Sequence, residues 1–345
     1  MALKAYRMTA PGSAAVVDVE PPRPGPHDAL LRVRAAGVCH TDVNLLRSPD
    51  AGGVSLPVTL GHEIVGDVVA FGSSVSDMAI GATVAVYELI GCGRCAACER
   101  GEDNVCRVLA PKAPGVSFDG GMAEYVVVPA RNLVDIGSLD PVDAAPLTDA
   151  GMTAFHAVER GRAWLMPDAT AVVIGIGGLG HMALQFLAAT SDATVTAVDV
   201  DRSRLDLARD LGAAAGVMAG DSAAREVIAG NGGRMVDVVF DFVGSQQSLD
   251  LAAAITGRGG GIIVTGSGGG RLCLTAAIGT GALPDREVTM IHTFGGTRAD
   301  LAAALRLAEA GRVHARVQTF ALEDAGLAID ELAAGRVLGR AVLVP

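Results

Sequence analysis

The stretch VVIGIGGLG at residues 172–180 decides the fold of this chain, because three spaced glycines join an apolar strand to a helix. In a G-x-G-x-x-G turn, Gly175 permits a tight bend, Gly177 lets a pyrophosphate approach the backbone, and Gly180 lets helix and strand pack closely. The helix N-terminus offers N–H groups and a partial positive charge to the phosphates. Because the chain has 45 glycines, this spacing alone is weak evidence, and its context decides.

Asp199 supplies that context. It ends a second apolar strand, nineteen residues after Gly180, where its carboxylate can accept hydrogen bonds from the adenosine ribose hydroxyls. A carboxylate at this place repels a 2′-phosphate, so the sequence favours NAD over NADP. Arg202 and Arg204 lie close by and weaken the preference, unless they only form a solvated helix face.

Strands and helices alternate around this motif, from Thr148 to about Gly281, which predicts a doubly wound parallel sheet. We expect helices over residues 179–189, 202–211 and 246–256.

The segment before the α/β region has a different residue pattern. From Leu30 to about Val128, short β-type runs alternate with Gly and Pro, which indicates a compact β-rich unit. After Pro284 we expect a strand, a helix over 298–311 and a terminal strand that close back on this unit. The expected fold class is therefore α/β, with a discontinuous β-rich domain at 1–147 and 284–345 and a nucleotide-binding domain at 148–283.

Composition excludes several functions. Half of the 345 residues are hydrophobic, yet no run of about 20 apolar residues predicts a membrane span. The first twenty residues lack the apolar core of a secretory signal, so we expect a cytoplasmic protein. The net charge of −11 and the absence of a Lys/Arg run argue against a nucleic-acid surface.

Four cysteines stand in a C-x2-C-x2-C-x7-C cluster, namely Cys92, Cys95, Cys98 and Cys106. Four thiolates so close in sequence can complete a tetrahedron around one zinc and leave no open position, which is typical of a structural site. We expect this lobe to contribute local folding and no chemistry. The six cysteines of the chain fit a reducing compartment.

A second metal site is suggested by CHTD at 39–42 and GHE at 61–63. A thiolate, an imidazole and one further carboxylate would form a three-ligand zinc site with one position open to substrate. Taken singly, Cys39 is as well explained as a core residue and His62 as a structural histidine.

The ordered set of motifs resembles the zinc-dependent medium-chain alcohol dehydrogenases. The resemblance covers essentially the whole chain and is closest to the bacterial NAD-dependent secondary-alcohol dehydrogenases and aryl aldehyde and ketone reductases. Its motifs are GVCHTD at 37–42, GHE at 61–63, the four-cysteine lobe, PLTDAGMTAFHA at 146–157, VIGIGGLG at 173–180 and the terminal GRAVLVP.

The resemblance implies a GroES-like catalytic domain, a Rossmann domain, and hydride transfer between a primary or secondary alcohol and NAD, with zinc as Lewis acid. Cys39, His62 and Asp149 would hold the catalytic zinc, beside a structural zinc in the lobe. Glu63 would be an occasional alternative ligand. Asp42 would accept the free imidazole N–H of His62.

The resemblance further implies that Thr41 starts a proton relay, that His40 and Arg340 touch the cofactor pyrophosphate, and that Thr153 contacts the nicotinamide. A homo-oligomer, dimer or tetramer, is implied through an edge strand at 288–293. The residues expected to line the dinucleotide are Gly175, Gly177, Gly178, Leu179, Gly180, Asp199, Arg204 and Val243.

Departures from the family pattern concern the substrate. Asn44 replaces a histidine that ends the proton relay in several relatives, and Ile90 and Phe294 stand where related enzymes often have tryptophan. We hypothesise an open, aliphatic pocket that accepts a bulky alcohol, aldehyde or ketone, unless other loops fill the space. Its residues would be Asn44, Leu45, Tyr87, Ile90, Phe118 and Phe294.

Two alternatives share this fold. One is a non-catalytic, nucleotide-binding or regulatory member, and the other is a metal-independent quinone reductase. Both are disfavoured because Cys39, His62 and Asp149 are all present.

Overall fold

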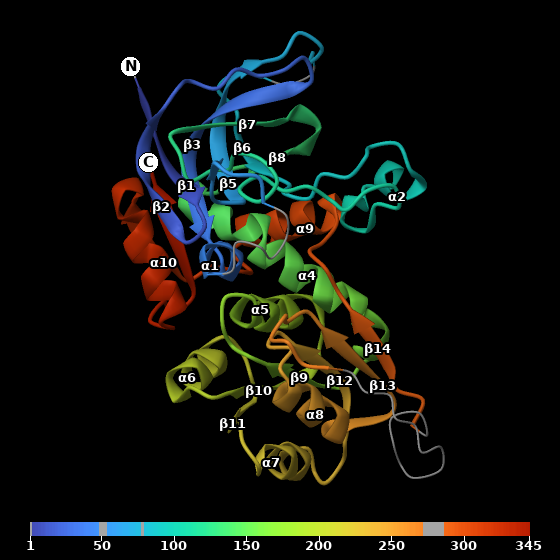
Figure 1. The fold of residues 1–345 in the computed structure, drawn as a ribbon. Helices are drawn as coiled ribbons and strands as arrows, with labels where there is room; N and C mark the ends of the chain where they lie inside the picture. Colours follow the sequence, from blue (N-terminus) through green and yellow to red (C-terminus); the bar gives the residue numbers. More distant parts are fainter. Residues whose placement is uncertain (1, 48–53, 77–78, 272–285) are drawn as a thin grey trace. The chain divides into compact units, whose positions relative to one another are not determined.

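The computed structural model describes residues 2–47, 54–76, 79–271 and 286–345 (Figure 1). The chain divides into two compact units, one formed by Met1–Met152 with Thr297–Pro345 and the other by Thr153–Gly296. We call them unit 1 and unit 2. The first division falls inside helix α4 (Ala150–Arg160).

Unit 1 is built on a seven-stranded sheet, as the β-type runs predicted. Its central strand β3 pairs with three strands, β5, β7 and β16, and each of them runs antiparallel to it. The sheet comprises β15 (Val317–Ala321), β16 (Arg340–Val344), β3 (Asp28–Val38), β5 (Glu63–Phe71), β6 (Thr83–Val86), β8 (Leu133–Asp135) and, paired to β3, β7 (Tyr125–Pro129). A second sheet contains β2 (Ser13–Val19), β1 (Leu3–Ala10) and β4 (Val58–Thr59). The core between these elements is fully buried at Met8, Leu31, Leu60, Ile64 and Met122.

Helices complete unit 1. Besides the start of α4, they are α1 (His40–Arg47), α2 (Ala96–Glu99), α3 (Pro141–Ala144), α9 (Arg298–Glu309) and α10 (Ala325–Ala333). Helix α9 matches the helix expected over 298–311, and it begins at a capping box in which Thr297 and Asp300 each bond the other's backbone N–H.

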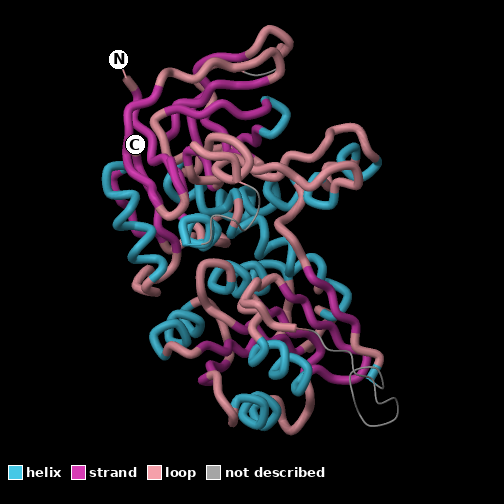
Figure 2. The backbone as a smooth tube through the Cα atoms, viewed as in Figure 1, coloured by secondary structure: helices cyan, strands magenta, loops and turns pink. Residues whose placement is uncertain are grey.

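Unit 2 is a six-stranded parallel sheet, as its alternation of strands and helices predicted (Figure 2, strands in magenta). The strand order is β11 (Ala215–Met218), β10 (Thr194–Asp199), β9 (Thr170–Ile174), β12 (Val236–Asp241), β13 (Thr256–Val264) and β14 (Thr289–His292). The helices are α5 (Gly180–Thr190), α6 (Arg202–Asp210), α7 (Ala223–Gly230) and α8 (Gln246–Ile255). Helices α5 and α6 cover one face of the sheet, and α7 and α8 cover the other (Figure 1).

The direction of winding reverses at β9. The chain runs outward through β10 and β11, returns to β12 on the other side of β9, and continues outward through β13 and β14. In open α/β sheets, ligands bind at such a switch point, outside the carboxyl ends of the strands. The turn at residues 175–180 follows β9 and therefore lies at this point.

The expected boundary after residue 283 needs correction. Strand β14 pairs in parallel with β13, with Gly261 opposite Thr289 and Val264 opposite His292. It therefore belongs to the sheet of unit 2, and the division falls after Gly296. A short strand pattern does not say which sheet receives the strand, because that depends on long-range backbone pairing.

None of the helices in the described residues is long and apolar enough to cross a membrane.

Candidate active site

The expected metal ligands of unit 1 come from the ends of neighbouring strands. Cys39 directly follows β3, and His62 directly precedes β5, which runs antiparallel to β3. Asp149 follows the 3-10 helix η3 (Ala145–Thr148), which packs against both strands. One ligand atom from each of Cys39, His62, Glu63 and Asp149 can be chosen so that all lie within 4.8 Å of one another.

The donor set fits a zinc ion. His62 is buried, its Nε2 lies 3.4 Å from Asp149 Oδ2, and Cys39 is partly buried. A thiolate, an imidazole and a carboxylate are the groups that zinc prefers. Burial lowers the pKa of His62, but Asp42, Asp149 and Cys39 outweigh it and raise that pKa well above its ordinary value. The surroundings of His62 therefore favour a positive charge, which a bound cation would supply.

Asp42 does not make the hydrogen bond expected of it. Its Oδ1 lies 3.8 Å from His62 Nδ1, beyond hydrogen-bond distance. The fully buried carboxylate instead accepts the backbone N–H of Cys39 at 2.9 Å and that of Gly61 at 3.3 Å. Asp42 thus ties together the two turns that carry the thiolate and the imidazole, and burial raises the pKa of its carboxyl.

Glu63 and Arg340 form a buried ion pair, with side-chain exposures of 0% and 3%. Arg340 begins β16 and Glu63 begins β5, on either side of β3. Gly37 of β3 lies opposite Glu63, and its missing side chain leaves the room that the glutamate occupies. The charge of Cys39 acts on the buried Arg340 guanidinium, but burial outweighs it and lowers the pKa of Arg340. Its pyrophosphate contact therefore stays a prediction, whereas its ion pair with Glu63 is a structural fact that sequence reasoning missed.

Helix α1 presents the expected proton-relay residues. Thr41 is exposed, with its Oγ1 3.7 Å from Cys39 Sγ, and Asn44 is exposed one turn further along. His40 is also exposed, whereas Thr153 of unit 2 is buried. The cofactor contacts expected of these last two residues stay predictions.

Glu88 is a site residue that sequence reasoning missed. Its side chain is buried, with 6% of its surface exposed. Burial, followed by the charge of Asp149, raises the pKa of its carboxyl well above the ordinary range. The available signal was a carboxylate inside the apolar run TVAVYELI at 83–90, since a buried acid is rare unless it is paired.

Two members of the hypothesised substrate pocket are core residues instead. Leu45 is 4% exposed and packs in the core of unit 1, and Tyr87 is fully buried. Tyr87 lies under the guanidinium of Arg298 at 5.6 Å, and its hydroxyl oxygen accepts a backbone N–H from Asn104. Aromatic or aliphatic type alone does not distinguish a pocket wall from the core. The other members keep exposed surface, and these are Asn44, Ile90, Phe118 and Phe294.

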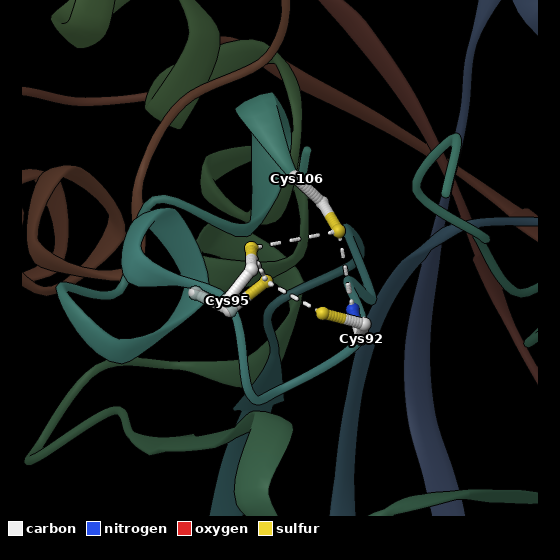
Figure 3. Close-up of side chains that lie close together, drawn as sticks. Cys92, Cys95 and Cys106 are labelled. Carbon is white, nitrogen blue, oxygen red and sulfur yellow. Dashed lines mark hydrogen bonds between the residues drawn. The ribbon is translucent and has the colours of Figure 1, made fainter. Parts of the chain in front are cut away.

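The four-cysteine lobe gathers its thiols as the spacing predicted. In Figure 3, Cys92, Cys95 and Cys106 point toward one another. The Sγ–Sγ distances are 3.6 Å between Cys95 and Cys98, 3.9 Å between Cys92 and Cys98, and 4.0 Å between Cys95 and Cys106. A tetrahedral zinc with Zn–S bonds of about 2.3 Å separates its sulfurs by about 3.8 Å. Backbone N–H groups of Cys98 and Arg107 lower the pKa of Cys95 to about 6, which favours the thiolate that binds metal.

The glycine-rich turn of unit 2 has the shape that a dinucleotide requires. Gly175 has φ +87°, and a Cβ there would lie 2.5 Å from Val243. A Cβ on Gly180 would collide with the Gly175 carbonyl, so helix α5 approaches the turn as closely as the motif predicted. Beside Gly177, apart from its chain neighbours, no atom of the described residues lies within 4 Å of the Cβ position, which leaves open space at the glycine expected to approach the pyrophosphate.

Asp199 has a further function at this turn. Its buried carboxylate accepts the backbone N–H of Ile176 at 2.6 Å and that of Asp201 at 2.9 Å. Arg204 lies 3.9 Å away. Asp199 therefore holds the glycine-rich turn against the end of β10, and its expected contact with the ribose stays a prediction.

A zinc-type donor set in a β-rich unit and a nucleotide turn in a parallel sheet define the class of zinc-binding, dinucleotide-dependent oxidoreductases. Comparison with known proteins supports this class. Residues 25–138 match the alcohol dehydrogenase GroES-like domain, and residues 178–310 match the zinc-binding dehydrogenase domain.

Similar proteins cover nearly the whole chain. An NAD-dependent alcohol dehydrogenase of Sulfurisphaera tokodaii is 37% identical over 342 residues, 95% of each chain. A D-arabinose 1-dehydrogenase (NADP(+)) of Saccharolobus solfataricus is 32% identical over 340 residues, 96% of this chain and 94% of the relative. The crystal structure of the alcohol dehydrogenase from Aeropyrum pernix aligns with a TM-score of 0.91 at 36% identity, covering 99% of this chain and 100% of that one. The chain belongs to the zinc-type medium-chain alcohol dehydrogenase family and is an oxidoreductase that acts on alcohols.

Proposed function

We propose that the chain is an NAD-dependent alcohol dehydrogenase, and in reverse a carbonyl reductase, whose catalytic zinc is held by Cys39, His62 and Asp149. The observation that carries this proposal is the convergence of these three side chains, from segments far apart in sequence, within 4.8 Å of one another. The primary or secondary alcohol is a small molecule that enters beside the exposed Thr41.

When bound, zinc supplies the Lewis acidity that polarises the substrate oxygen, and NAD supplies the hydride acceptor. The chain itself moves the proton. The Thr41 hydroxyl, at the edge of the ligand set, takes the proton of the substrate hydroxyl while passing its own outward. Asn44 lies three residues further on the same helix and directs that proton toward solvent.

Arg340 acts on the ligands from the buried side. Its guanidinium pairs with Glu63, which directly follows the expected ligand His62. The positive charge of Arg340 offsets the negative charge of Glu63. This pairing keeps the Glu63 carboxylate from competing with Asp149 as a metal ligand.

The cofactor assignment rests on Asp199. A buried carboxylate at the end of β10 disfavours a 2′-phosphate by charge repulsion. The relative named for NADP(+) shows that both cofactors occur among similar proteins. The guanidinium of Arg204 lies 3.9 Å from the Asp199 carboxylate and offsets part of its negative charge. We therefore expect NAD to be preferred over NADP without NADP being rejected completely.

The four-cysteine lobe holds a second, structural zinc in this proposal, supported by its sulfur spacing. We further propose a cytoplasmic homo-oligomer, dimer or tetramer. Strand β14 supports association, because it ends its sheet among the described strands and an edge strand can pair with another chain. Light scattering on the purified protein tests the oligomeric state.

The experiment for the whole proposal is a spectrophotometric screen of alcohols and carbonyls with NAD(H) and NADP(H), together with zinc analysis. We expect two zinc ions per chain and turnover with NAD. Cys39→Ser is the control. Unchanged turnover in that variant, or zinc in the lobe alone, would contradict the mechanism and favour a non-catalytic member of the family.

A further inference from the structure

Two buried aspartates flank the glycine-rich turn of unit 2. Strands β10 and β12 lie on either side of β9, and they end at Asp199 and Asp241 respectively. Asp199 holds the turn through the backbone N–H of Ile176. Asp241 is fully buried and lies outside the G-x-G-x-x-G motif. The nucleotide motif therefore does not explain why a carboxylate is buried at the end of β12.

Asp241 fixes the two loops that follow β12 and β13. Its side-chain Oδ1 accepts the backbone N–H of Val243 at 2.8 Å and that of Gly244 at 2.9 Å. Its backbone carbonyl accepts the N–H of Thr265 at 2.8 Å and that of Gly266 at 3.1 Å. Both loops are thereby tied to the carboxyl end of β12, which is the edge of the sheet where ligands bind.

The two loops also hold each other. The N–H of Gly268 donates to the carbonyl of Val243 at 2.9 Å, and the N–H of Gly270 donates to the carbonyl of Gly244 at 2.9 Å. A Cβ on Gly266 would lie 2.1 Å from the carbonyl carbon of Val243, so the two backbones are in direct contact. The position of Val243 is therefore set from both loops.

Val243 connects this arrangement to the glycine-rich turn. A Cβ on Gly175 would lie 2.5 Å from Val243 Cγ2, so a valine methyl fills the space beside the first glycine of the turn. The valine still has 39% of its surface exposed. Because the turn is expected to carry the pyrophosphate, the exposed part of Val243 lies beside the same binding site. The hydrogen bonds of Asp241 therefore fix a side of the dinucleotide site.

The topology assigns this side to one half of the cofactor. In a doubly wound sheet the dinucleotide crosses the switch point, and each half of the sheet binds one mononucleotide. Asp199 is expected to bind the adenosine ribose on the β10 side of β9. The loop that begins at Phe242, on the β12 side, is therefore expected beside the nicotinamide half.

The second carboxylate oxygen of Asp241 points to a function beyond stability. Asp241 Oδ2 is buried and has no hydrogen-bond partner among the residues that the structure describes. Burying a polar atom without a partner costs stability, and proteins depart from full satisfaction mainly at functional sites.

We infer that Asp241 is a positioning residue for the nicotinamide half of NAD, because it fixes the loop of Val243 and Gly244 through their backbone N–H groups. The inference rests on the proposed function, since it requires NAD as the cofactor. Asp241 belongs to unit 2, whereas the proposed zinc ligands belong to unit 1. Its effect on the cofactor can therefore be measured separately from zinc binding.

Two substitutions separate the hydrogen-bond acceptor from the charge. Asp241→Asn keeps an acceptor oxygen with the same reach, whereas Asp241→Ala removes it. Fluorescence titration gives the Kd for NADH, and calorimetry gives the Kd for ADP, which carries the adenosine and two phosphates without the nicotinamide half. Thermal unfolding measures the stability of each variant. Asp192→Ala, at an exposed position before β10, is the matched control.

We expect Asp241→Ala to raise the Kd for NADH about 10-fold, because the loop would hold its binding shape only part of the time. Its Kd for ADP should stay close to the wild-type value, and Asp241→Asn should bind both ligands like the wild type. A purely structural residue would lower Tm in Asp241→Ala and leave the Kd for NADH unchanged, which would overturn the inference. Equal weakening of ADP and NADH would also overturn it, as would loss of NADH binding in a folded Asp241→Asn protein.

Val243→Ala keeps the test decisive if Asp241→Ala does not fold. It shortens a partly exposed side chain and leaves the hydrogen bonds of Asp241 in place. The Kd for NADH should rise a few-fold with the Kd for ADP unchanged, and unchanged NADH affinity would overturn the inference. A wild-type protein that binds neither NADH nor ADP would overturn the proposed function as well, which distinguishes the two failures.

Discussion

The four-cysteine lobe and the Cys39 site are the two proposed thiolate metal sites of unit 1, but they are assembled in different ways. The lobe takes all of its ligands from residues 92–106, whereas the second site draws on residues 39, 62 and 149. In the lobe, short-range chain geometry is enough to bring the four sulfurs within 4.8 Å of one another. The second site needs the antiparallel pairing of β3 with β5 and the packing of η3 against them.

The difference teaches what each site requires. A closed set of four ligands stabilises local structure, whereas a site with three ligands and buried carboxylates around it depends on the sheet for its geometry. The same exchange, cysteine to serine, should therefore have opposite consequences in the two regions.

The largest effect is expected from Cys39→Ser. Losing the thiolate removes several kcal/mol of transition-state stabilisation, so kcat/KM should fall about 10³-fold or more. The lobe should keep its zinc, and Tm should stay close to wild type. Steady-state kinetics, zinc analysis and thermal unfolding measure this. A variant that unfolds but retains its specific activity would reverse the comparison.

Cys98→Ser is the matched change in the lobe. Cys98 is buried and contacts two other sulfurs, so its loss should release the lobe zinc and destabilise unit 1 by about 2 kcal/mol or more. For a unit of this size the fall in Tm would be about 4–8 °C. Activity per folded molecule should stay within a few-fold of wild type when measured well below Tm. A 10³-fold loss in folded protein would show that the lobe has a direct part in the chemistry.

Asp103→Asn tests how the lobe is anchored. The fully buried Asp103 accepts from Gly91 N–H at 3.0 Å and from Arg131 at 3.1 Å, and Arg298 lies 3.7 Å away. Because both arginines are more than one third exposed at the side chain, solvent screening limits the cost to about 1–2 kcal/mol. Chemical denaturation should show it, with faster loss of the lobe zinc. Asp18→Asn, in the exposed pair with Lys4, should leave stability unchanged.

Tyr87→Phe should have the smallest effect. It removes the hydroxyl that accepts from Asn104 while keeping the ring under Arg298, so stability should fall by about 1 kcal/mol. KM for alcohols should not change, because Tyr87 has no exposed surface. A clear rise in KM with unchanged stability would return Tyr87 to the substrate pocket.

Much of the molecule could be predicted from local pattern. The glycine-rich turn, the strands around it and helix α9 follow from residue spacing, and the three glycines have the surroundings that their separate functions require. The wrong predictions from sequence share one physical cause. Leu45 and Tyr87 were assigned to a pocket by residue type, and β14 to the wrong domain by its position in the chain, because neither clue reports long-range packing.

The sequence by itself determined the four-cysteine lobe, the nucleotide turn and the family of the chain, since ligand spacing and turn geometry act over a few residues. Only the tertiary structure decided which groups surround the proposed zinc ligands. Glu63 meets Arg340 across 277 residues of chain, and Asp42 bonds backbone N–H groups in place of His62. These contacts depend on which strands pair and which side chains are buried together, and no single segment of the sequence specifies either.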